Sequence, residues 1–178
     1  MALTAPTAPA GEPPRLYQEV AEAAEVPAQL LYALAAAESG AALSSGRYEP
    51  WPWTLNVGGE PERYPSREAA QAALRQHRAD GRRNIDVGLM QVNWHWHGER
   101  FASLSQALEP QANLQMGAAI LRGRYEERGD WLEAAGAYHA PSDPQAAAAH
   151  REAVAEHLPA PVGERAGSRS REGGLSCP

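Results

Sequence analysis

Glu38 combines a residue type and a position that could support acid–base chemistry. Residues 27–40 read Pro-Ala-Gln-Leu-Leu-Tyr-Ala-Leu-Ala-Ala-Ala-Glu-Ser-Gly, so Leu30, Leu34 and Glu38 recur every four residues. A helix therefore puts the carboxyl group on the apolar face that a globular protein buries. Burial and the negative end of the helix dipole both disfavour the ionised form, as a general acid working near neutral pH requires. Alternatively, this glutamate simply extends into water at the helix end.

Histidine and tryptophan side chains gather later in the chain. Residues 85–92 alternate in a way that predicts an extended segment, with Gly88 at a point of close backbone approach. Residues 94–97 read Trp-His-Trp-His and could bind a metal, stack against a sugar, or pack in a core or loop. Two histidines so close together, with no third ligand nearby, are poorly spaced for a zinc site, so we expect no metal. His150 and His157, on a predicted final helix, are expected on a solvated face.

Helices must position most of these side chains. Ala, Leu, Glu, Gln and Arg dominate the composition, whereas the single Phe and the few β-branched residues argue against an all-β fold. Pro27 suits the first position of the Glu38 helix, and Gly40 suits a left-handed residue just past its end. Residues 53–57, with 63–64 returning, predict a small β element, so we expect a mainly α, α+β architecture. Further helices are predicted at 14–25, 66–80, 110–128, 130–141 and 143–158, and a loop at 41–50.

The composition limits the classes of partner. The net charge is −6 and the sequence has no basic stripe, so nucleic acid is not an expected partner. The length of 178 residues suits one domain, expected at 14–158, with terminal extensions. Cys177 is the only cysteine, which excludes an intramolecular disulfide or a cysteine-based zinc site. No apolar run predicts a membrane span, and no signal peptide is visible. We expect a monomer with disordered extensions at 1–13 and 159–178.

Three separated motifs occur together in this chain: Glu-Ser-Gly at 38–40, Gly-Leu-Met-Gln-Val-Asn at 88–93 and Ala-Tyr at 137–138. In this combination they resemble the lytic transglycosylase (SLT) domain of the lysozyme-like superfamily, and the resemblance covers residues 16–158. A narrower resemblance is to the specialised transglycosylases of conjugation, integrating elements, type IV secretion and pilus systems. It is carried by residues 51–59, 64–70 and 86–94.

The resemblance implies a role for each matching residue. Glu38 would be the catalytic glutamate, Ser39 its hydrogen-bonding companion, and Tyr138 would orient the glutamate through its hydroxyl group. The chain departs from the family pattern at His139, where the family favours asparagine. The residues implied to bind substrate are Met90, Gln91, Asn93, Trp53, Asn56 and His139.

The resemblance also implies a reaction. It cleaves the β-1,4 bond after N-acetylmuramic acid in peptidoglycan and closes a 1,6-anhydro ring with help from the substrate's own 2-acetamido group, so no metal or cofactor is implied. The main rival reaction is hydrolysis by a goose-type lysozyme, for which Asp86 is the candidate second carboxylate. Asp86 could instead hydrogen-bond backbone in a turn or at a strand edge. The chain could also be a non-catalytic scaffold that holds peptidoglycan, or an intracellular binding module.

The family leads us to expect a periplasmic protein. Its expected partners are peptidoglycan glycan strands and components of a secretion, conjugation or pilus apparatus.

Overall fold

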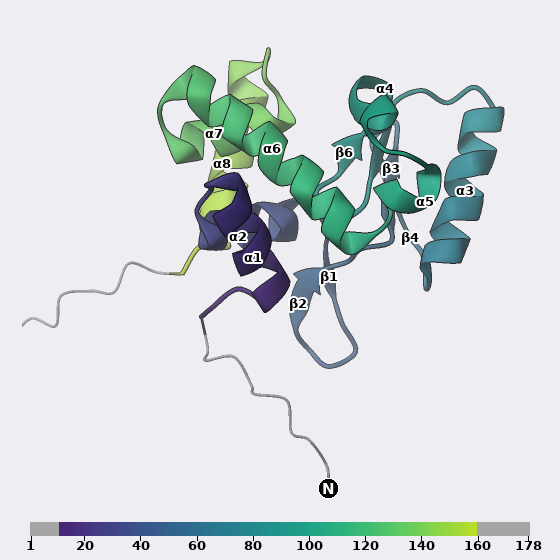
Figure 1. Cartoon of the computed structure of the whole chain (residues 1–178), viewed down its shortest axis with the longest axis horizontal. Helices are drawn as coiled ribbons and strands as arrows, with labels where there is room; N and C mark the ends of the chain where they lie inside the picture. Colours follow the sequence, from purple (N-terminus) through teal and green to yellow (C-terminus); the bar gives the residue numbers. More distant parts are fainter. Residues whose placement is uncertain (1–10, 160–178) are drawn as a thin grey trace, which may run out of the picture.

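The computed structural model describes residues 11–159, which form a helical layer and a small sheet with its own flanking helices (Figure 1). The predicted extensions at 1–13 and 159–178 lie outside these residues, apart from 11–13 and 159. None of the helices in the described part has both the length and the apolarity needed to cross a membrane. The expected α+β, lysozyme-like architecture is confirmed.

The helical layer is built from both ends of the described chain. Its central helix carries Leu30, Leu31 and Leu34, which are all buried, and alanines that let neighbouring helices approach it on several sides. The helices of this layer are α1 (Arg15–Ala24), α2 (Ala28–Ser39), α6 (Pro110–Arg128), α7 (Trp131–His139) and α8 (Pro144–Glu156).

Helix α8 packs against both α2 and α7, although α2 and α8 are far apart in the sequence. Gly136 in α7 permits this approach, because a Cβ atom there would lie 2.6 Å from the carbonyl oxygen of Ala147 in α8. Figure 1 shows α7 and α8 together at the same end of the molecule, beyond α2. This packing brings the last helix to the end of α2 that carries Glu38.

The sheet lies on the other side of α6 and is antiparallel throughout (Figure 1). Its strand order is β4-β3-β5-β6, with Leu55 opposite Val87 and Asn56 opposite Asp86. The apolar members of these pairs are fully buried, whereas Asn56 and Asp86 are only partly buried. The strands are β3 (Thr54–Val57), β4 (Glu60–Arg63), β5 (Ile85–Val87) and β6 (Val92–Asn93), flanked by α3 (Arg67–Ala79), α4 (Trp94–His97), the 3-10 helix Gly98–Arg100 and α5 (Leu104–Ala107).

Local capping signals place the helix ends correctly. The Ser66 hydroxyl accepts a hydrogen bond from the Ala69 N–H at the start of α3, and Asp130 caps α7 by accepting from two backbone N–H groups. Helix α6 spans 110–128 as predicted, and Gly129 ends it in the left-handed region with φ 75°. These ends follow the sequence because each depends on residues within one turn.

Two predictions about the segment after α2 are wrong. Residues 41–50 are not a simple loop, because Gly40–Ala42 (β1) pairs with Tyr48–Pro50 (β2). Gly40 is not left-handed: its φ is −56°, and it begins β1. A glycine is needed there for space, since a Cβ atom would lie 2.2 Å from the Tyr48 ring.

The predicted extended segment at 85–92 is interrupted by a tight turn. Strands β5 and β6 form a hairpin around residues 88–91. Gly88 has φ 81°, and a Cβ atom there would lie 2.5 Å from Asn113 Nδ2, so the expected close approach is confirmed. Gln91 adopts φ 43°, a left-handed conformation that is costly for a residue with a Cβ atom. We call residues 88–91 the site turn.

Candidate active site

Side chains from two helices hold the site turn from one side. Ser39, the last residue of α2, is fully buried, and its hydroxyl oxygen lies 2.7 Å from the carbonyl oxygen of Leu89. Tyr138 of α7 donates its hydroxyl hydrogen to the carbonyl oxygen of Met90 at 2.7 Å. The single O–H of Tyr138 is directed at the turn, so its oxygen is left to accept from a protonated Glu38, and the expected orientation of Glu38 by Tyr138 stays a prediction.

A third helix holds the same turn through Asn113 of α6, which is 1% exposed. Its Oδ1 accepts from the Met90 N–H at 2.9 Å, and its Nδ2 donates to the carbonyl oxygens of Val87 at 2.8 Å and Ala107 at 2.9 Å. Both donor hydrogens and the carbonyl oxygen of this buried amide are thus used to fix backbone. Asn113 is not among the site residues predicted from the sequence; its signal was an amide within the otherwise apolar face of a helix.

The site turn borders a cavity of about 640 Å³ with Glu38 in its wall. The Glu38 side chain is only 8% exposed, and its Oε1 atom is buried. The cavity also contains five other predicted site residues: Asp86, Gln91, Asn93, Tyr138 and His139. The lining is completed by Asn84, Val92, Trp96, His97, Ile120, Arg124 and Pro141.

His150 of α8 contacts the glutamate directly. Its Nε2 atom lies 3.0 Å from Glu38 Oε1, and the His150 side chain is 10% exposed. Neither atom has a hydrogen bond of good geometry within the described part of the chain, so the two buried polar atoms face each other without another partner. The prediction that His150 and His157 lie on a solvated face is wrong, because α8 packs against α2. His157 stacks on the ring of Tyr48.

His139 lies on the open side of the same cluster. Its Nδ1 atom is 3.9 Å from Glu38 Oε1, and its side chain is 54% exposed. The rings of His139 and His150 are stacked, with centroids 4.5 Å apart and an interplanar angle of 16°. Glu38 is thus next to two imidazoles, one largely shielded from solvent and one exposed.

Asp86 supplies a second carboxyl group to the cavity. Its Oδ1 accepts a hydrogen bond from Asn93 Nδ2 at 2.7 Å. Burial raises the pKa of Asp86, the hydrogen bond from Asn93 opposes that rise, and the nearby Glu38 carboxylate adds to it. Burial also raises the pKa of the Tyr138 hydroxyl, and the charges of Glu38 and Asp86 add to the effect.

Gln91 connects the site turn to the sheet. Its Nε2 lies 2.8 Å from the carbonyl oxygen of Gly88 and 3.2 Å from that of Thr54, and it donates to both. These bonds fix the side chain that lines the cavity and help to offset the left-handed backbone at this residue.

Four predicted site side chains do not line the cavity. Ser39 and Met90 are fully buried, and Met90 packs against Gly117, where a Cβ atom would lie 2.4 Å from Met90 Cγ. Asn56 accepts a hydrogen bond from the Gly59 N–H, and Trp53 packs against the core beside Trp51. Ser39 and Met90 therefore act on the cavity through the backbone of the site turn.

The aromatic segment 94–97 separates into two environments. Trp96 is 76% exposed and lies at the Glu38 cavity, where a flat apolar ring can stack against a sugar. Trp94 points the other way, with its ring parallel to that of Phe101. It lines a second cavity of about 440 Å³.

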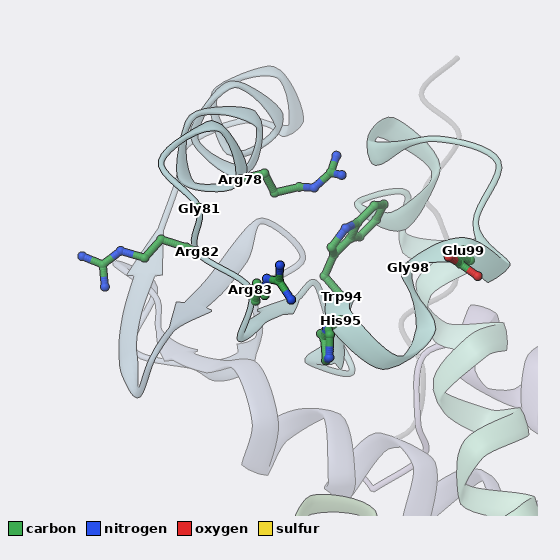
Figure 2. A pocket seen from close by; sticks show the side chains of 8 residues that line it. All are labelled: Arg78, Gly81, Arg82, Arg83, Trp94, His95, Gly98 and Glu99. Atoms are coloured by element: carbon green, nitrogen blue, oxygen red, sulfur yellow. The ribbon is translucent and has the colours of Figure 1, made fainter.

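The second cavity is basic (Figure 2). Its lining includes Arg78, Arg82 and Arg83, and the Arg78 guanidinium lies 5.1 Å from the centre of the Trp94 ring. In Figure 2, Arg78 and Arg83 extend toward Trp94, whereas Arg82 points away. The carboxyl group among its lining residues belongs to Glu99, so this cavity lacks the paired carboxyl groups of the first.

Comparison with known proteins gives one family match. A family model described as transglycosylase SLT domain matches residues 15–154. The matched region contains the whole of the cluster formed by Glu38, His139 and His150, and the site turn between them. No curated protein and no solved structure matches the chain.

Proposed function

The chain belongs to the transglycosylase SLT domain family, and on that premise we propose that it is a lytic transglycosylase of peptidoglycan with Glu38 as its catalytic acid and base. The family supports lytic transglycosylase activity on peptidoglycan in general. The observation that carries the proposal for this chain is the position of Glu38, whose shielded carboxyl group forms part of the wall of a cavity large enough for a sugar.

The proposed reaction needs one carboxyl group in two roles. Protonated Glu38 gives its proton to the glycosidic oxygen while the bond from that oxygen to C1 breaks. The resulting carboxylate then takes the proton of the C6 hydroxyl group as its oxygen bonds to C1. The ring closes as a 1,6-anhydro sugar, no water is consumed, and Glu38 recovers its proton.

His150 is the residue best placed to position this carboxyl group. The Tyr138 hydroxyl donates to Met90, and of the two imidazoles beside Glu38 Oε1, His150 is the nearer, with Nε2 at 3.0 Å against 3.9 Å for His139 Nδ1. An imidazole nitrogen can accept from the protonated acid or donate to the carboxylate, depending on its own protonation. It can therefore keep Glu38 oriented through both stages of the reaction.

The cavity offers contacts for a polar sugar chain. Gln91, Asn93 and His139 contribute hydrogen-bonding groups, and the exposed Trp96 ring provides a stacking surface. We propose these four residues as the substrate contacts, with Ser39, Tyr138 and Met90 positioning the backbone between them.

Glu38→Gln tests the catalytic role, because the amide fills the same space but has no proton to transfer. We expect at least about a hundredfold loss of peptidoglycan release, in line with general acid catalysis. The control is Glu22→Gln, an exposed residue of α1, which should keep full activity. Unchanged thermal unfolding of both variants would separate lost chemistry from lost structure. Full activity in Glu38→Gln would refute the catalytic role of Glu38, whereas a native chain that binds peptidoglycan but releases none would refute the enzyme assignment in favour of a scaffold.

Hydrolysis is the second candidate function, because Asp86 places another carboxyl group in the Glu38 cavity. A goose-type lysozyme would use such a group to activate water on the opposite face of the sugar. Mass spectrometry of the released fragments distinguishes the two reactions, since hydrolysis leaves a reducing N-acetylmuramic acid end that is one water molecule heavier than the anhydro end. We expect anhydro ends, and we expect Asp86→Asn to leave the type of product unchanged.

We further propose that the enzyme opens the wall locally for an envelope-spanning apparatus, such as one for conjugation, type IV secretion or pilus assembly. The support is the resemblance of residues 51–59, 64–70 and 86–94 to transglycosylases of such systems. Action on peptidoglycan in the periplasm is the corresponding expected location. Loss of apparatus function on deletion, restored by the native chain and not by Glu38→Gln, is the expected result.

A further inference from the structure

We propose that Glu38, His139 and His150 form a binding site for a divalent transition metal, with Zn²⁺ the best match to the donor set. Within residues 11–159, this is the one group of three or more His, Cys, Asp or Glu side chains whose ligand atoms converge. Two imidazole nitrogens and one carboxylate oxygen are a donor set that proteins use for zinc with an open fourth position.

The donor atoms are close to the separations that a zinc ion needs. Zinc bonds of about 2.0–2.2 Å at tetrahedral angles separate neighbouring donors by about 3.3 Å. Glu38 Oε1 lies 3.0 Å from His150 Nε2 and 3.9 Å from His139 Nδ1, and all three donors lie within 4.8 Å of one another. Two of these distances bracket the required value, so the donor atoms themselves need shift only slightly once the His139 ring has the right orientation.

The buried members of the cluster carry the strongest indication of a ligand. Glu38 Oε1 and His150 Nε2 are buried and lack a well-formed hydrogen bond within the described residues. Such atoms are costly unless something satisfies them. A cation between them and His139 would take up the lone pairs of all three.

His139 has to turn for the site to form. A metal lies in the plane of the imidazole that binds it, and two stacked rings cannot both direct their nitrogens at one point. His150 is held between helices, but the His139 side chain is 54% exposed and faces the cavity, so it has the space to rotate. The cavity also gives the ion a route of entry and room for a water ligand.

The cavity holds charges of both signs. Asp86 favours a cation there, and the positive charge of Arg124, which also lines the cavity, is partly offset by its ion pair with Glu127 at 3.0 Å. Since the metal would bind the oxygen that the proposed reaction uses for proton transfer, we infer that zinc inhibits the enzyme. The inhibition, unlike the metal binding, depends on the proposed function.

Binding is tested with Zn²⁺ alone, by calorimetric titration of the full chain after chelator treatment. Cys177→Ser serves as the background, so that the thiol cannot supply a ligand. We expect one zinc per chain. His139→Ala, a change at an exposed position, should weaken zinc binding by at least about tenfold, because losing even a residue that only orients a metal ligand weakens binding by about 10- to 100-fold. The matched control is His95→Ala, an exposed histidine outside the cluster, which should bind zinc normally.

A second readout uses Co²⁺ in place of zinc. A three-ligand protein site should give the strong visible absorption of low-coordinate cobalt, and His139→Ala should reduce it. No zinc binding, or equal binding by His139→Ala and the background protein, would overturn the metal site. A protein that binds zinc through His139 yet releases no peptidoglycan would overturn the proposed function and leave the metal site standing. Activity that zinc does not inhibit, in a protein that binds it, would overturn the inhibitory role.

Discussion

Replacing Asn113 with alanine should destabilise the protein strongly, because one buried amide fixes three backbone groups. The variant loses the hydrogen bonds to the Met90 N–H and to the carbonyl oxygens of Val87 and Ala107. Each bond contributes about 0.5–1.5 kcal/mol, and a buried group left without a partner costs about 1–3 kcal/mol. Some of these groups will find water in the space that the amide leaves. We therefore expect a loss of about 3–4 kcal/mol.

Urea unfolding followed by circular dichroism measures this loss. The midpoint should fall at an unchanged m-value, and the melting temperature should drop by about 6–16 °C, given about 2–4 °C per kcal/mol for a chain of this size. Gln115→Ala is the matched control, since it removes an exposed amide from the same helix. Asn113→Asp should not rescue stability. It keeps an acceptor for the Met90 N–H, but it places a carboxylate oxygen, in place of an N–H donor, against two carbonyl oxygens. A loss below about 1 kcal/mol, or one equal to that of the control, would refute this account of the site turn.

Two further predictions concern packing and pH. Gly117→Ala should lower the free energy of unfolding by about 1–3 kcal/mol, because the added methyl would lie 2.5 Å from Met90 Cβ, an atom that cannot move without its backbone. Thermal unfolding measures this loss, and a wild-type midpoint would show that the helix can shift freely. Burial raises the pKa of Glu62, but hydrogen bonds from Tyr64 and His77 outweigh it, so the folded pKa lies below the unfolded one. The stabilisation that this gives is present above the unfolded carboxyl pKa of about 4.3 and lost as pH falls through the folded value. Glu62→Gln should therefore lower the urea midpoint at neutral pH and much less near pH 3, and an equal loss at both would contradict the assignment.

The elements that sequence analysis predicted well are those fixed by nearby residues. Ser66 and Asp130 begin helices through their own side chains, and Gly129 ends one because only glycine adopts φ 75° cheaply. Gly40 looks equally clear as a left-handed stop, yet it begins a strand. Its glycine is required by the ring of Tyr48, a contact that no pattern around Gly40 contains.

The candidate active site likewise combines residues that local motifs predict with contacts that they do not. The family motifs marked Glu38, Gln91 and Tyr138, and the structure gathers all three at one cavity. Motifs do not say which atom of a residue is used, however. The Tyr138 hydroxyl, expected to orient Glu38, donates its hydrogen to the backbone carbonyl of Met90, a bond that no motif indicates.

His150 is the residue that could not have been predicted, and the reason is geometric. Its neighbours on α8 are mostly alanine, so its own sequence context suggests only a surface helix. What decides its position is Gly136, which lets α8 approach α7 closely enough for the imidazole to reach the end of α2. The environment of Glu38 thus depends on a missing Cβ atom almost one hundred residues away in the chain. A proton donor with a histidine at 3.0 Å is chemically different from one with a tyrosine hydroxyl, since an imidazole can hold a proton or bind a metal at the same atom. The packing of α8 against α7 therefore determines that the neighbour of this carboxyl group is a side chain able to hold a proton or bind a metal ion.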